Sequence, residues 1–81
     1  MIEPAEIKTL IEAGLPGAVV EVTGDGSHFE AIVISDAFAG KRTLERHRMI
    51  NATLGDRIIN GTIHALSIKL CATPAEQAEG R

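Results

Sequence analysis

The sequence predicts a single α+β domain in which a three-stranded mixed sheet carries its helices on one face. Its 81 residues are enough for one domain with a modest core. Hydrophobic periodicity switches along the chain in the order helix, strand, strand, helix, strand. A short glycine-containing turn joins the first two strands, which is typical of an antiparallel hairpin. We expect the core to span about residues 3–72 and a polar, frayed tail to span residues 73–81.

The first helix is expected from about residue 3 to residue 13. Pro4 suits a first helical turn, and Glu3 complements the positive end of the helix dipole. An apolar stripe at i, i+3 and i+4 spacing is formed by Ile7, Leu10 and Ile11. Gly14 is a natural helix stop.

The hairpin follows, with strands expected over residues 18–23 and 29–35. The turn between them, Gly24–Ser27, contains Asp-Gly, and His28 stands where the chain leaves the turn for the second strand. The connecting segment that begins at Ser35 is expected to break at Gly40.

The second helix is expected to begin at about Thr43, with Thr43 as a possible N-cap, and to kink or end at Gly55. One face at helical spacing contains Leu44, His47, Ile50 or Asn51, Leu54 and Ile58.

The third strand is expected over residues 62–70. Leu66, Ile68 and Leu70 should share one face and alternate with Ala65, Ser67 and Lys69. Beyond it, we expect at most one helical turn after Pro74.

Residues 36–61 are long enough for a right-handed crossover, which predicts that the second and third strands are parallel. Parallel neighbours begin at the same end of a sheet, so His28 and His64 should emerge at one rim. Neutral imidazole binds iron, zinc or copper, and two imidazoles would half-fill a four-coordinate site. The alternatives are that His28 only decorates the turn and that His64 packs against a carbonyl. His47 is interpreted as a packing or surface residue, and Cys71 as a small buried hydrophobe.

Composition narrows the function classes. The single cysteine cannot form an internal disulfide, and neither a signal peptide nor a membrane span is visible, so we expect a cytoplasmic protein with no membrane partner. No paired carboxylates, nucleophile–base arrangement or phosphate-binding glycine loop suggests an enzyme. The net charge of -3 and the two phenylalanines argue against general nucleic-acid binding.

A basic segment at the start of the second helix keeps nucleic-acid binding open as an alternative. Residues 41–48 contain four basic residues and only one acidic residue, Glu45. The basic residues are Lys41, Arg42, Arg46 and Arg48. Together with His47 they could bind DNA or dock an acidic partner surface, although no Gly-x-x-Gly clamp accompanies them.

Three separated segments resemble the BolA family, especially its short IbaG-like branch. They are "GDGSHFEAIVIS", "FAGKRTLERHRMINATL" and "IHALSIKLCATP", which agree with the family in order and spacing over roughly residues 5–76. The resemblance implies the BolA-like, class II KH-like fold, in agreement with the α-β-β-α-β order. Where many relatives carry a Trp after Thr-Pro, this chain has Gln77.

The resemblance implies an adaptor that pairs with a monothiol glutaredoxin of the CGFS type around a shared [2Fe-2S] cluster. The partner would supply its cysteine and a bound glutathione thiol, and this chain would supply His64 and His28. No cofactor is expected in the isolated chain, which should be a monomer or weak homodimer. Cluster trafficking or iron sensing would be its role, and the family is also linked to transcription regulation and stress response. A protein–protein module without metal is the third possibility.

Overall fold

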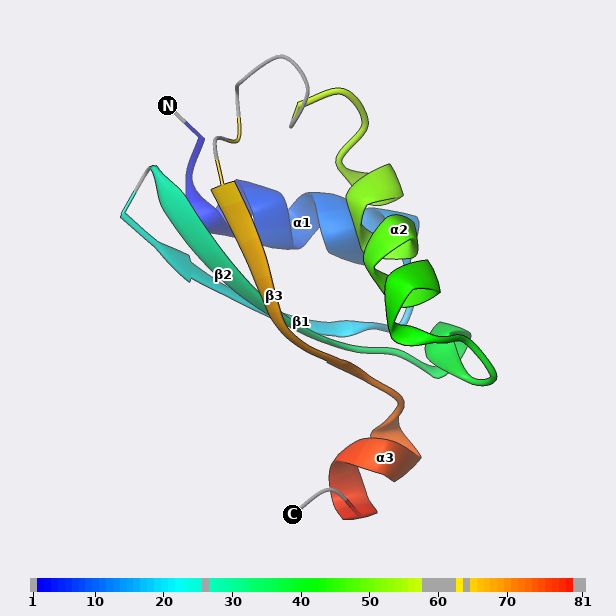
Figure 1. Ribbon diagram of the computed structural model, residues 1–81. Helices are drawn as coiled ribbons and strands as arrows, with labels where there is room; N and C mark the ends of the chain where they lie inside the picture. The colour runs from blue at the N-terminus through cyan, green and yellow to red at the C-terminus, as the bar shows by residue number, and fades with distance from the viewer. Residues whose placement is uncertain (1, 26, 58–62, 64, 80–81) are drawn as a thin grey trace.

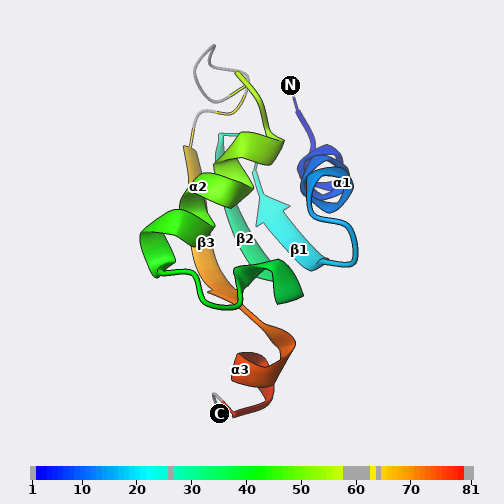
Figure 2. The same ribbon diagram turned by 90° about the vertical axis from the view of Figure 1, so that its right-hand side faces the viewer.

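The computed structural model describes residues 2–25, 27–57, 63 and 65–79. The elements are α1 (Pro4–Gly14), β1 (Val19–Gly24), β2 (His28–Ile34), a 3-10 helix η1 (Asp36–Phe38), α2 (Thr43–Thr53), β3 (Ala65–Ala72) and α3 (Pro74–Glu79). The sheet order is β1-β2-β3, with β1 antiparallel and β3 parallel to β2. Helices α1 and α2 cover one face of the sheet, and α3 lies beyond the end of β3 (Figures 1 and 2). The predicted mixed sheet and the parallel crossover are confirmed.

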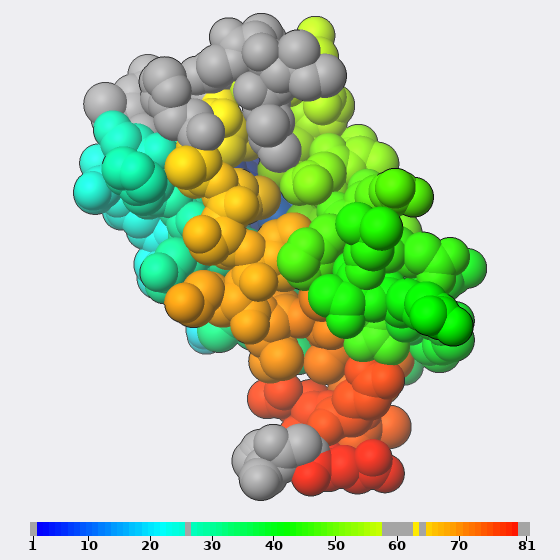
Figure 3. All heavy atoms as spheres, viewed as in Figure 1, coloured from blue at the N-terminus to red at the C-terminus, as the bar shows by residue number. Residues whose placement is uncertain are grey.

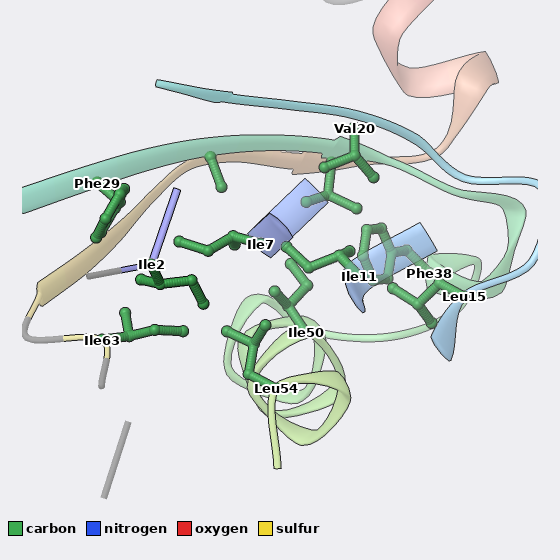
Figure 4. Close-up of a cluster of buried hydrophobic side chains, with 12 residues drawn as sticks. Ile2, Ile7, Ile11, Leu15, Val20, Phe29, Phe38, Ile50, Leu54 and Ile63 are labelled. Atoms are coloured by element: carbon green, nitrogen blue, oxygen red, sulfur yellow. The ribbon is translucent and has the colours of Figure 1, made fainter. Parts of the chain in front are cut away.

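The core lies between the sheet and the two covering helices (Figure 4). Both phenylalanines of the chain are buried there: Phe29 from β2 is 1% exposed and Phe38 from η1 is fully buried. The expected stripe of α1 contributes Ile7 and Ile11, both fully buried. Each such side chain stabilises the fold by roughly 1.5–3 kcal/mol relative to an exposed one.

Hydrogen bonds between a backbone N–H and a glutamate carboxylate mark the start of α1 and of α2. The Glu3 N–H donates to Glu6 Oε1 at 2.9 Å, and the Arg42 N–H donates to Glu45 Oε1 at 2.9 Å. Arg42 is therefore the N-cap of α2, and the expectation that Thr43 caps it is wrong. A carboxylate at the third helical position satisfies the backbone donor that would otherwise be left unpaired.

The buried face of α2 is narrower than its sequence pattern suggests. Ile50 and Leu54 are fully buried, whereas Leu44 is 60% exposed. Where α1 meets α2, a Cβ on Gly14 would lie 2.5 Å from Thr53 Cγ2, so the glycine permits a close helix contact. Helix α2 therefore packs through its C-terminal half. Ile58, the last residue expected on this face, lies outside the described residues.

A bulge in β3 changes which residues face the core. Ile68 pairs with Ala31 and Leu70 pairs with Ile32, so Lys69 is the extra residue. An extra residue inverts the side-chain alternation beyond it. Leu70 is consequently 38% exposed, and Cys71 instead packs against the core. The expectation that Leu70 shares a face with Leu66 and Ile68 is wrong for this reason.

The segment after β3 forms a short helix that begins with a capping box. The expected helical turn after Pro74 is present as α3, and a reciprocal cap opens it. The Glu76 N–H donates to Thr73 Oγ1 at 3.1 Å, and the Thr73 N–H donates to Glu76 Oε1 at 3.0 Å. The fraying of this tail stays a prediction, and residues 80 and 81 lie outside the described residues. None of the helices in the described ranges has the length and apolar character needed to cross a membrane.

Candidate functional site

His28 is the first residue of β2 and its side chain is exposed. Its N–H donates to Asp25 Oδ1 at 2.9 Å, and its carbonyl accepts from the Asp25 N–H at 3.2 Å. The next residue, Phe29, is buried and anchors the start of the strand. The main chain of His28 is thus held while its imidazole faces outward, and no hydrogen bond joins the ring to another described residue.

The strand register defines what lies beside His28. The Cα of His28 pairs with that of Ala65, the first residue of β3. Both strands therefore begin at one end of the sheet, the upper end in Figure 1. His64, predicted as the firmer of the two ligands, precedes Ala65 in the sequence and lies outside the described residues, as do Thr62 and the expected start of the strand.

The chemistry of the donor set can be tested against an iron–sulfur cluster. Such a cluster takes four ligands besides its own sulfides, and histidine can replace cysteine among them. Within the described ranges, no group of three or more His, Cys, Asp or Glu side chains could hold a metal ion. The exposed ring of His28 fits the role of one ligand in a set completed by His64 and a partner.

Cys71 lies at the opposite end of the sheet from His28. It pairs with Val33 in the register, and it packs against the core. Burial raises the pKa of the thiol, although the nearby Arg46 acts against this. Cys71 is half-buried, so it packs against the core as expected but is less buried than expected, and its thiol is remote from the rim at His28.

The basic segment at the start of α2 divides into two kinds of residue. Lys41, Arg42 and Arg48 are exposed, and His47 is half-buried. Arg46 is different, because only 11% of its side chain is exposed and its guanidinium makes four hydrogen bonds. Arg46 is therefore a structural residue, and the expectation that it belongs to a free binding surface is corrected.

The contacts of Arg46 join three parts of the fold. Its guanidinium donates a bidentate pair of hydrogen bonds to the Glu76 carboxylate, Nη1 to Oε1 at 2.7 Å and Nη2 to Oε2 at 3.0 Å. It also donates to the carbonyls of Cys71 at 3.0 Å and Lys41 at 2.9 Å. The guanidinium carbon lies 5.7 Å from the ring centre of Phe38. Figure 3 shows α2 beside β3, with α3 directly beyond them.

This clasp of Arg46, Glu76 and Thr73 has an electrostatic signature. The hydrogen bonds from Arg46, followed by the backbone bond from Thr73, lower the pKa of Glu76 to about 2. The same ion pair raises the pKa of Arg46. At the other end of the sheet, backbone hydrogen bonds from His28 and Ser27 lower the pKa of Asp25.

Sequence reasoning missed Asp25, Thr73 and Glu76. A signal for the last two was present, because Thr-x-x-Glu before a helical segment is a capping box. No local signal paired Arg46 with Glu76, since the two residues are 30 positions apart.

The fold and these segments define a member of the BolA-like protein family. The family model matches residues 11–76, and the chain therefore belongs to this family. Within the family it is 36% identical over 80 residues to the acid stress protein IbaG of Escherichia coli, covering 99% of this chain and 94% of that protein. This relative represents the short branch expected from the sequence.

Two other relatives are longer than this chain. Protein BOLA2 of Arabidopsis thaliana is 51% identical over 59 residues, which cover 72% of this chain and 61% of that protein. The DNA-binding transcriptional regulator BolA of Vibrio cholerae is 48% identical over 50 residues, covering 62% of this chain and 46% of that protein.

The solved structure of a bolA homologue from Coxiella burnetii superposes with a TM-score of 0.84 at 42% identity, covering 96% and 99% of the two chains.

Proposed function

We propose that this protein is a non-enzymatic adaptor that pairs with a monothiol glutaredoxin and shares a [2Fe-2S] cluster with it. Cluster trafficking or iron sensing would be the outcome. The observation that carries the proposal is the rim where β2 and β3 begin together, because it presents the exposed His28 opposite Ala65. Family membership supports the same role.

In this proposal each partner contributes what the other lacks. This chain supplies imidazole nitrogens from His28 and His64, and the glutaredoxin supplies its cysteine thiolate and that of bound glutathione. The cluster supplies iron that such nitrogen and sulfur ligands can bind when they are deprotonated. A reducing, cytoplasmic setting belongs to the proposal because the thiolates must remain free.

Anaerobic reconstitution of the pair tests the proposal. The protein and a monothiol glutaredoxin are mixed with glutathione, iron and sulfide, and the isolated complex is assayed for iron, sulfide, visible absorption and visible circular dichroism. His28→Ala and His64→Ala should each change the dichroism and shorten the lifetime of the cluster. Glu30→Ala is the matched control, because Glu30 is also exposed on β2 and lies two residues from His28.

Two results would contradict the adaptor proposal. A wild-type pair that binds without iron and sulfide would favour the module without metal. A His28→Ala, His64→Ala double variant with the wild-type spectrum would remove both imidazoles from the ligand set.

DNA binding is the second candidate, favoured by one observation on the surface. Lys41, Arg42 and Arg48 remain exposed around the N-terminal half of α2, and a relative is named as a DNA-binding regulator. Three phosphate contacts would make duplex binding fall steeply with salt. Reversing Arg42 and Arg48 to Glu should abolish such binding, measured by fluorescence anisotropy at low and moderate salt. Absence of binding at low salt would eliminate this candidate.

A further inference from the structure

The turn that precedes His28 is organised by one side chain, that of Asp25. Its Oδ1 accepts two backbone bonds at 2.9 Å, from the N–H groups of Ser27 and His28. Its own N–H donates to the carbonyl of His28 at 3.2 Å. Asp25 therefore holds both backbone polar groups of His28, and it does so through side chain and main chain together.

The neighbouring residues leave the turn little freedom to adopt another shape. Gly24 pairs with Phe29 in the register, and a Cβ on Gly24 would lie 2.6 Å from the carbonyl oxygen of His28. Phe29 is 1% exposed, so the chain directly after His28 cannot shift without disturbing the core. His28 is thus fixed from both sides, by Asp25 before it and by Phe29 after it.

We propose that Asp25 is a positioning residue for the His28 imidazole. The proposal rests on the adaptor function above and adds a residue to it. A ligand on a loose turn must lose its backbone freedom when it binds, whereas a ligand held in advance does not. Asp25 acts through hydrogen bonds to the backbone of His28 and contributes no atom to the ligand set.

Two substitutions of Asp25 distinguish a positioning role of its hydrogen bonds from an effect of its negative charge. Asn in place of Asp25 keeps an oxygen acceptor in the same place, whereas Ala removes it. Asp25→Ala should shorten the cluster lifetime about tenfold, the change that corresponds to ordering one backbone residue. Asp25→Asn should restore most of the lifetime. Asp36→Ala is the matched control, because Asp36 is an exposed aspartate just beyond the other end of β2.

The experiment has two readouts on the same variants. In the isolated protein, NMR amide exchange should show Ser27 and His28 exchanging about tenfold faster in Asp25→Ala than in the wild type or Asp36→Ala. In the reconstituted glutaredoxin complex, visible circular dichroism and cluster lifetime should follow the same order, while the affinity for the apo-glutaredoxin stays unchanged. A purely structural role would change the melting temperature and the partner affinity instead.

The outcomes distinguish failure of the positioning role of Asp25 from failure of the proposed adaptor function. A wild-type pair without iron and sulfide overturns the adaptor function and with it the cluster role of Asp25. A wild-type pair that holds a cluster, with Asp25→Ala matching it in spectrum and lifetime, overturns only the positioning role. Asp25→Asn behaving as badly as Asp25→Ala overturns the hydrogen-bond account in favour of the carboxylate charge. Unchanged exchange of the Ser27 and His28 amides in Asp25→Ala also overturns it.

Discussion

The two ends of the sheet are held together in opposite ways. At the end where β2 begins, short-range bonds within the turn hold the backbone, and the His28 side chain stays exposed. At the end where β3 stops, a nearly buried Arg46 connects α2, the last residues of β3 and α3. The first end leaves a side chain available for a partner, and the second uses its charged side chains internally. A charged residue in a sequence can therefore either stay exposed, where a partner can bind it, or make contacts within the fold.

The largest expected effect comes from removing the buried ring at either end. Phe29→Ala and Phe38→Ala should each lower the free energy of unfolding by about 3–5 kcal/mol, because a large cavity replaces a fully packed ring. Urea unfolding followed by far-UV circular dichroism measures both. A loss below about 1 kcal/mol for either ring would show that its end of the sheet is not anchored by the core.

A smaller loss is expected from breaking the clasp at the far end. Arg46→Ala should lower the free energy of unfolding by about 2 kcal/mol, because it strands Glu76 and two backbone carbonyls. Arg46→Lys keeps the charge but not the two-pronged contact, so it should recover only part of the loss. Urea unfolding is again the measurement, with Arg48→Ala as the control because Arg48 is exposed on the same helix. Equal effects of Arg46→Ala and Arg48→Ala would contradict the clasp.

Glu76 should be protonated, and the clasp weakened, only at a lower pH than the one at which an ordinary glutamate is protonated. The pKa of Glu76 is lowered to about 2 in the folded protein, against a usual 4.5, so its stabilising contribution is complete above about 4.5. That contribution is lost as the pH falls from about 4.5 toward 2. Stability measured across this range should fall less in Glu76→Gln than in the wild type. Parallel curves for the two proteins would exclude the ion pair as the cause.

Salt should distinguish the two ends as well. Glu76 owes its lowered pKa first to a charged partner, whereas Asp25 owes its own first to neutral backbone donors. Raising the ionic strength should therefore move the pKa of Glu76 back toward its usual value more than that of Asp25. Carboxyl carbon shifts followed by NMR during a pH titration report both groups. A larger salt response at Asp25 would reverse this assignment of causes.

The smallest effect on stability is expected at the rim where His28 lies. His28→Ala should change the free energy of unfolding by no more than about 0.5 kcal/mol, because the exposed ring makes no hydrogen bond to another described residue. In the proposed complex with glutaredoxin, the same variant should change the visible circular dichroism and shorten the lifetime of the cluster. Urea unfolding checks the first statement, and a loss above about 1 kcal/mol would mean that the ring has a structural role.

Much of the fold could be predicted because its signals are local. The stripe at Ile7 and Ile11, the turn before His28 and the stop at Gly14 each depend on residues a few positions apart. The parallel pairing of β2 and β3 also followed, since the connection between them is long enough for a crossover. His28 could be identified as a rim residue for that reason, and the family resemblance assigned it a chemical role.

What the sequence alone determined, then, is the order of elements, the hairpin and the end of the sheet at which His28 emerges. Only the tertiary structure decided that Lys69 is an extra residue, that Leu70 consequently faces solvent, and that Arg46 serves Glu76 rather than a partner. The physical reason is distance along the chain. Periodicity and turn chemistry act over a few residues, whereas the register of β3 and the clasp of Arg46 depend on contacts that exist only after the chain has folded.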